Sequence, residues 1–129
     1  MTTPTGKEVH EWAQECLEIC EAVESQLSST IYRTETSRWW AITNELSKLT
    51  HKLAIVKMKL FFDKPKGLPA GRALRFVSET MQSAMTAYSH MYHREVLSYE
   101  DISQHCKGDC KKTIQKVKKE LEGLQKRCN

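Results

Sequence analysis

The side chains of this sequence that are best suited to chemistry are basic ones, spaced along one flank of a single expected helix. Lys48, Lys52 and Lys59 fall close together on this flank, and Arg38 lies roughly between it and the apolar face of the same helix. On a helix that rises ~1.5 Å per residue, Lys48 and Lys59 stand roughly 16 Å apart. Because residues 46–62 contain no acidic side chain, we expect the row not to be neutralised by its own helix and to suit a phosphate backbone.

Further cations follow along the chain and indicate nucleic acid as the partner. Lys57 lies within the same helix, and Lys64 stands at its expected end, shortly before Arg72 and Arg75. Phosphate contacts from lysine give affinity without sequence specificity through counterion release, and double-stranded RNA is recognised chiefly by its shape. We therefore expect an RNA-binding surface made of Arg38, Lys48, Lys52, Lys57, Lys59 and Lys64. Lysine rows serve RNA and DNA alike, and a solvated face on a core helix is the alternative interpretation.

Two cysteine pairs raise the question of a metal. Cys16 with Cys20, and Cys106 with Cys110, each place two thiols one helical turn apart, and two such pairs on facing helices would supply the four thiolates of a tetrahedral zinc site. Cys16 and Cys20 also fall on an apolar stripe, where free cysteine behaves as a small hydrophobe. The sequence predicts core cysteines and no metal, with a zinc-stabilised bundle kept as the third interpretation.

The sequence contains no recognisable catalytic motif. A nucleophile needs a base held beside it, and no nucleophile elbow, phosphate-binding loop or metalloprotease helix occurs. We expect a protein that is not an enzyme and that has neither a cofactor nor a small-molecule substrate.

Composition and charge define the class of protein. The chain has 129 residues with 40% hydrophobic and 28% charged side chains, which suits one globular domain over residues 1–129. No run of about 18 apolar residues occurs, and the N-terminus lacks the apolar stretch of a signal peptide, so we expect a cytoplasmic protein with no membrane partner. Residues 1–29 carry a net charge of −5 and residues 33–75 a net charge of +7, which indicates one acidic and one basic surface.

Four helical patterns position these side chains, over residues 6–28, 37–62, 70–92 and 98–127. They predict an all-α fold, an elongated antiparallel helical hairpin or four-helix bundle. Thr36 or Ser37 is the expected N-cap of the second helix. The proline and glycine residues at 65–71 are expected to separate the second helix from the third.

Apolar spacing predicts the inner faces of two of these helices. The second carries a seam with spacings of three and four, at Trp39, Ile42, Leu46, Leu49, Leu53, Val56 and Leu60. Seven positions exceed what one short partner helix would cover, so we expect a dimer. The third is expected to bury Leu74, Val77, Met81, Ala84, Met85, Tyr88 and Met91. The basic fourth helix extends the nucleic-acid surface or forms the outside of a coiled coil.

One stretch of the chain resembles a known family. Residues Thr36-Ser37-Arg38-Trp39-Trp40 through Phe62-Asp63-Lys64-Pro65, about 40 residues with their surroundings, resemble the central RNA-binding helix of the small RNA-silencing suppressors of nodaviruses. That helix ends in a segment similar to Leu-Leu-x-Lys-Pro, and here the ending reads Leu60-Phe61-Phe62-Asp63-Lys64-Pro65-Lys66. Only Lys64 transfers by position, while Lys48, Lys52, Lys57 and Lys59 lie in the corresponding helix without exact alignment. The sizeable third helix and the basic fourth one depart from the shorter members of the family.

The resemblance implies an all-α homodimer that lies on one face of double-stranded RNA. It would bind without sequence preference and shield viral RNA from the dicing enzymes and silencing complexes of the host. The alternative, from a different class, is a helical interaction or scaffold module that docks an amphipathic partner helix or an acidic surface.

Overall fold

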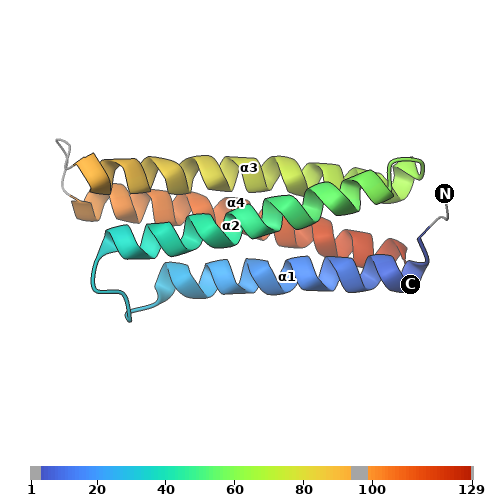
Figure 1. Ribbon diagram of the computed structural model, residues 1–129, viewed down its shortest axis with the longest axis horizontal. Helices are drawn as coiled ribbons and strands as arrows, with labels where there is room; N and C mark the ends of the chain where they lie inside the picture. Colours follow the sequence, from blue (N-terminus) through green and yellow to red (C-terminus); the bar gives the residue numbers. More distant parts are fainter. Residues whose placement is uncertain (1–3, 94–98, 129) are drawn as a thin grey trace.

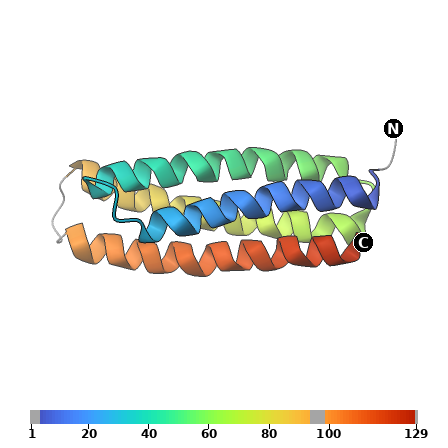
Figure 2. The same cartoon turned by 90° about the horizontal axis from the view of Figure 1, so that it is seen from below.

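Four long antiparallel helices form an elongated bundle in the computed structural model, which describes residues 4–93 and 99–128, with side chains at 4–90 and 102–128 (Figure 1). The helices are α1 (Gly6–Ser28), α2 (Glu35–Lys59), α3 (Lys64–His93) and α4 (Tyr99–Arg127). Both α1 and α3 pack against α2 and α4, so α1 and α3 lie diagonally across the bundle (Figures 1 and 2). The predicted all-helical class is confirmed. Within the described ranges, none of the helices is long and apolar enough to cross a membrane.

The first helix begins where its sequence provides a cap. The Thr5 hydroxyl oxygen accepts a hydrogen bond from the backbone N–H of Glu8 at 3.2 Å, which satisfies one of the free donors of the first turn. The buried face carries Val9, Ala13, Cys16, Leu17, Cys20 and Val23. Glu11, Glu18 and Glu21 are exposed, so α1 presents an acidic outer surface.

The second helix begins two residues before the predicted start, because the prediction placed the cap on the wrong hydroxyl. Thr34 is the N-cap, and its side-chain oxygen accepts from the backbone N–H of Ser37 at 3.1 Å. Glu35 consequently stands in the first turn, where its negative charge suits the N-terminal end of the helix dipole.

The third helix begins at Lys64, so the prediction that the proline and glycine residues separate two helices is wrong. Pro65 stands in the first turn, where a missing N–H leaves no helical acceptor unsatisfied. Pro69 lies inside the helix, and because it has no N–H the carbonyl of Pro65 lacks its usual donor four residues on. The guanidinium of Arg127, at the end of α4, donates to that carbonyl instead.

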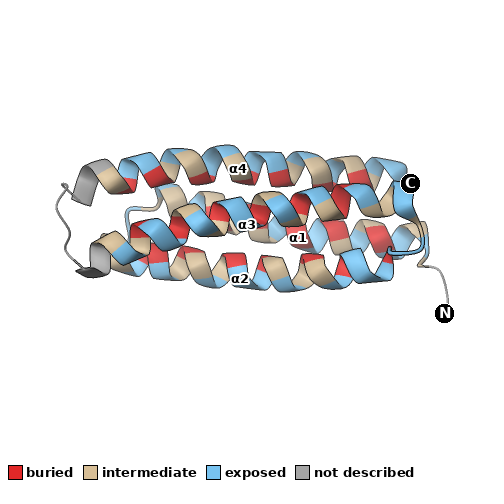
Figure 3. Cartoon of the chain, turned by 90° about the horizontal axis from the view of Figure 1, so that it is seen from above, coloured by how far each residue is buried: buried red, intermediate tan, exposed pale blue. Residues whose placement is uncertain are grey.

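The seam of α2 forms the centre of the core, as its spacing predicts. Trp39, Ile42, Leu46, Leu49, Leu53, Val56 and Leu60 are all buried inside the single chain (Figure 3). The seam faces neighbouring helices along its whole length, so it leaves no apolar remnant that would call for a second copy. The expected dimer stays a prediction without support from this seam.

The inner face of α3 differs from the prediction. Its buried side chains are the small ones, at Ala70, Ala73, Val77, Thr80, Ala84 and Ala87. Small side chains allow α3 to approach α4 closely, and Thr80 shares a hydrogen bond with Thr113 of α4. Of the predicted residues, Val77 and Ala84 are buried, and Leu74, Met81 and Tyr88 pack at the edge of the core. Met85 is 51% exposed, and the side chain of Met91 lies outside those described.

The seam should dominate stability. We expect Leu49→Ala, at a side chain with no exposed surface, to lower the free energy of unfolding by roughly 3 kcal/mol, since it leaves a cavity in a packed core. Urea unfolding followed by circular dichroism measures the change. The control Ser47→Ala, at an exposed position of the same helix, should change stability by no more than about 0.5 kcal/mol. Equal effects of the two substitutions would contradict this account of the core.

Candidate nucleic-acid interface

Two lysines of the predicted row are paired with carboxylates. Lys52 donates a hydrogen bond to Glu15 of α1 at 2.7 Å, and this bond raises the pKa of the lysine. The Nζ atom of Lys48 lies 3.4 Å from the Glu45 carboxylate of its own helix. The expectation that the row is not neutralised by its own helix is wrong for Lys48, because Glu45 itself pairs with this lysine. Lys52 is neutralised by the acidic helix beside it, which the expectation did not consider. Both pairs are exposed and contribute little to stability.

Lys59 lies against an aromatic ring on the same side of α2. Its Nζ atom is 4.3 Å from the centroid of the Trp12 ring of α1, a cation–π contact. Lys52 and Lys59 thus both face α1, on the flank that the sequence predicts for them. That flank borders the acidic helix.

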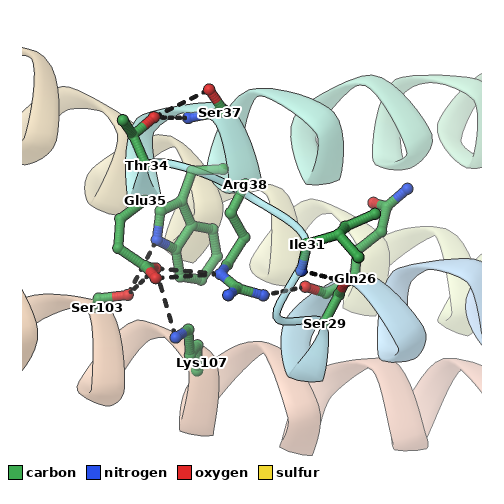
Figure 4. Close-up of polar contacts among 10 residues, drawn as sticks. Gln26, Ser29, Ile31, Thr34, Glu35, Ser37, Arg38, Ser103 and Lys107 are labelled. Atoms are coloured by element: carbon green, nitrogen blue, oxygen red, sulfur yellow. Dashed lines mark hydrogen bonds and ion pairs between the residues drawn. The ribbon is translucent and has the colours of Figure 1, made fainter.

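Arg38 is buried and belongs to the interior of the bundle (Figure 4). Its guanidinium pairs with Glu35 at 3.2 Å and donates to the backbone carbonyl of Gln26 at the end of α1. It also lies 5.3 Å from the centroid of the Tyr32 ring, in the connection between α1 and α2. With its donors used in this way, Arg38 ties that connection to the start of α2 rather than facing a ligand.

Glu35 is the centre of this polar network (Figure 4). Ser103 of α4 donates to its carboxylate at 2.6 Å, and the Nζ atom of Lys107 lies 3.4 Å away. The indole N–H of Trp39 donates to Ser103 at 3.3 Å, which joins the network to the core. Partial burial would raise the pKa of Glu35, but the hydrogen bond from Ser103 and the charges of Arg38 and Lys107 outweigh it and lower the pKa below its usual 4.5.

The other two predicted cations, Lys57 and Lys64, lie together at the opposite end of the bundle. They line a groove between α2 and α3 with Leu60, Phe61, Gly67, Leu68, Gly71, Arg72 and Arg75, here called the α2–α3 groove. Of its described lining residues, four are cations and none is acidic. Arg72 pairs with Glu120 of α4 at 3.1 Å. No carboxylate among the described residues pairs with Lys57, Lys64 or Arg75.

The position of α1 explains why no carboxylate of this acidic helix pairs with the cations of the groove. The acidic α1 packs against α2 and α4, and its carboxylates pair with lysines of both: Glu15 with Lys52, and Glu24 with Lys118 at 2.8 Å. The first turns of α3 lie diagonally across the bundle from α1. The cations in the first turns of α3 and at the C-terminal end of α2 therefore lie away from the acidic helix, and α4 carries further exposed cations, among them Lys112 and Lys116.

The groove also contains apolar side chains that sequence reasoning did not assign to any site. Phe61 is 69% exposed and Leu68 is 56% exposed, and both line the groove. Phe62 and Met58 next to it are exposed as well. For Met58, Phe61 and Phe62 the available signal was their position outside the periodic seam of α2, which predicts that the core does not cover these side chains.

The cysteines behave as core residues. All five are free and buried, and burial raises the pKa of Cys16 to about 11 and those of Cys20 and Cys110 to about 12. Thiols with such pKa values are protonated at neutral pH. Across residues 4–90 and 102–128, no group of three or more His, Cys, Asp or Glu side chains is arranged to hold a metal ion.

No family model, curated protein or solved structure matches this chain. The resemblance to the nodavirus suppressors stays a prediction, and the argument for function rests on the surface chemistry of the α2–α3 groove.

The Glu35 network should make stability depend on pH. A carboxyl whose pKa is lowered in the folded state stabilises the fold above its unfolded pKa, and this contribution is lost as the pH falls through the folded value. We expect Glu35→Gln to lower the free energy of unfolding at about pH 7. The gap, which is the difference in this free energy between the variant and the unsubstituted protein, should narrow at about pH 3. Urea unfolding at both pH values measures the gap. Glu79→Gln, which makes the same change at an exposed site on α3, is the control, and an equally large gap at both pH values would contradict the role of the Glu35 charge.

Proposed function

We propose that this protein binds double-stranded RNA without sequence preference through the cations of the α2–α3 groove. The observation that carries the proposal is the convergence on one groove of Lys57, Lys64 and Arg75, which no described carboxylate pairs, with no acidic residue among the described lining. Arg72, which pairs with Glu120 of α4, lines the same groove. Cations that keep their charge release counterions when they meet phosphates, which provides affinity independent of sequence.

The spacing of these cations suits a duplex. Lys64 and Arg75 stand roughly 16 Å apart along α3, at about 1.5 Å per residue, so they are able to reach different phosphates of one duplex. Lysine provides a compact charge, and arginine is able to hold a phosphate with two parallel hydrogen bonds. Double-stranded RNA exposes its phosphates and 2′-hydroxyls across a wide, shallow groove, where recognition depends on shape.

The basic surface continues onto α4 through one aromatic ring. The guanidinium carbon of Arg75 lies 5.2 Å from the centroid of the Phe76 ring, and the Nζ atom of Lys116 lies 5.5 Å from it. Phe76 thus holds a cation from each helix over its ring. Lys116 extends the proposed footprint beyond the groove and gives the basic fourth helix a part in it.

The wider proposal follows the family resemblance. Two copies of the chain would lie on one face of a viral RNA duplex in the cytoplasm and keep host silencing enzymes from it. Of the predicted RNA-binding residues, Lys57 and Lys64 belong to this surface. Lys48 and Lys52 are proposed to stay outside it, since carboxylates already neutralise them.

A helical interaction module is the second candidate function. The specific observation that favours it is the exposed apolar pair Phe61 and Leu68 in the same groove. Phosphate groups make no apolar contacts with such side chains, whereas a partner helix would bury them.

Two double variants with the same change in charge separate the groove from the paired lysines. We expect Lys57→Gln with Arg75→Gln to weaken binding to a duplex of about 20 base pairs by tenfold or more. Two lost phosphate contacts should also reduce, by about two, the steepness of the slope of the logarithm of the binding constant against the logarithm of the salt concentration. We expect Lys48→Gln with Lys52→Gln to change the affinity by less than about threefold. Fluorescence anisotropy at two salt concentrations measures both, with circular dichroism to verify folding.

The outcome for the second variant matters as much as that for the first. Equal losses in both variants would show that only the overall charge matters, and a loss confined to the Lys48 and Lys52 variant would move the interface to the α1 side of α2. Either result would contradict the proposed surface.

Preference among nucleic acids tests shape recognition. We expect tighter, salt-sensitive binding to the RNA duplex than to the matching DNA duplex or to single-stranded RNA, because only the RNA duplex has A-form geometry throughout. Competition with unlabelled nucleic acids measures the ratio of the affinities for the three ligands. Equal weak binding to all three would indicate non-specific attraction to a basic surface.

A further inference from the structure

The α2–α3 groove has an apolar interior that phosphate binding leaves unexplained. Leu60, with 1% of its surface exposed, lines the groove together with Phe61 and Leu68, which are 69% and 56% exposed. The groove has a volume of about 510 Å³. A nucleic acid would pair with the four cations but would leave these side chains in water, so a second kind of ligand fits the groove better than RNA alone.

The two glycines of the groove differ in the space that lies beside their Cα atoms. A Cβ atom on Gly67 would lie 2.9 Å from the backbone oxygen of Leu60, so this glycine is required for α3 to approach the end of α2. A Cβ atom on Gly71 would meet only the Cε atom of Lys57, at 3.9 Å. The space beside Gly71 is thus open to a side chain from another molecule.

We propose that the α2–α3 groove binds an acidic amphipathic helix of a partner protein. Apolar side chains of that helix would occupy the space between Phe61, Leu68 and Gly71, and its carboxylates would pair with the four cations. Helices that bind in grooves use apolar residues on one face at spacings of three and four. Because the groove is bordered by cations and its described lining contains no acid, charge complementarity selects a partner with acidic flanks. This proposal rests on the second candidate function, the helical interaction module, and does not depend on RNA binding.

A second copy of this chain is a poorer occupant. Two grooves placed face to face would bring Lys57, Lys64, Arg72 and Arg75 against the same cations of the other copy. The acidic α1 of another copy would offer glutamates, but its apolar side chains at Val9 and the following buried positions are already inside its own bundle. Neither arrangement supplies apolar anchors together with acidic flanks.

The concave shape of the groove favours a helix over an anionic membrane surface as its ligand. A bilayer would accept exposed Phe61, Phe62 and Met58, but a flat surface has no projecting side chain to fill the open space beside Gly71. A side chain projecting from a helix would fill that space. The cations from Lys64 to Arg75 span roughly 16 Å, which a partner helix of about 12 residues matches at about 1.5 Å per residue.

Filling the groove at Gly71 tests the proposal. The probe is a fluorescein-labelled helical peptide of about 12 residues with leucines at helical spacing and glutamates on both flanks, next to a scrambled peptide of the same composition. Gly71→Leu places a side chain in the open space without a backbone clash, and Gly123→Leu is the matched control on α4, where a Cβ atom meets nothing within 4 Å. Thermal unfolding verifies that both variants fold.

We expect the unsubstituted protein and Gly123→Leu to bind the peptide with similar affinity, and Gly71→Leu to bind at least tenfold more weakly. Lys57→Gln with Arg75→Gln should also weaken it, and the scrambled peptide should not bind. Failure of the unsubstituted protein to bind the peptide, or equal binding by Gly71→Leu, overturns the proposal. Binding to phosphatidylserine vesicles that Gly71→Leu leaves unchanged, without peptide binding, would overturn it in favour of a membrane surface.

The same variant keeps this proposal apart from RNA binding. If Gly71→Leu loses the peptide and retains the RNA duplex, the apolar groove and the cationic surface are two functions of one site. Peptide binding by a protein that does not bind RNA would contradict the proposed function and support the docking groove. RNA binding by a protein that does not bind the peptide would do the reverse.

Discussion

Burial of the apolar seam of α2 is the constraint on which the rest of the structure depends. Each large seam side chain contributes roughly 1.5–3 kcal/mol when it is removed from water, whereas an exposed ion pair contributes about 0–1 kcal/mol. The rotation of α2 about its axis is therefore decided by Trp39, Leu46, Leu53 and the other seam residues, all buried. The lysines of α2 occupy whatever positions this rotation leaves to them.

That rotation explains why lysines close together in sequence have different surroundings. Lys52 and Lys59 face α1, where they meet Glu15 and the ring of Trp12. Lys57 faces α3 instead, next to Gly71, and lines the groove. The antiparallel arrangement then brings the first turns of α3 beside the end of α2. The close approach at Gly67 and the support that Arg127 gives to the proline-containing turn hold the two sides of the groove in place.

The two ends of the bundle have different physical character. At one end Glu35, Arg38 and Ser103 join α2, α4 and the end of α1 in a network of hydrogen bonds and ion pairs within the chain (Figure 4). At the other end the cations of the groove have few acidic partners, and Phe61 and Phe62 are exposed to solvent. Satisfied polar groups stabilise a fold, and unsatisfied charge beside exposed apolar surface is typical of a binding site. These differences are the reason that the proposed function is assigned to the α2–α3 end.

The sequence by itself determined the number of helices, the bounds of α1 and α4 to within a residue, and the seam of α2, because apolar periodicity reports which face of a helix is buried. It placed the cap of α2 two residues late and the start of α3 six residues late, because a hydroxyl or a proline has several possible positions in a first turn. Of the six predicted site residues, Lys57 and Lys64 line the α2–α3 groove, but the sequence predicted neither this groove, nor the burial of Arg38, nor the pairing of Lys52 with Glu15. Only the tertiary structure decided those, since the periodicity of one helix does not say which helix lies beside each flank, and it is the neighbouring helix that neutralises a charge or leaves it free.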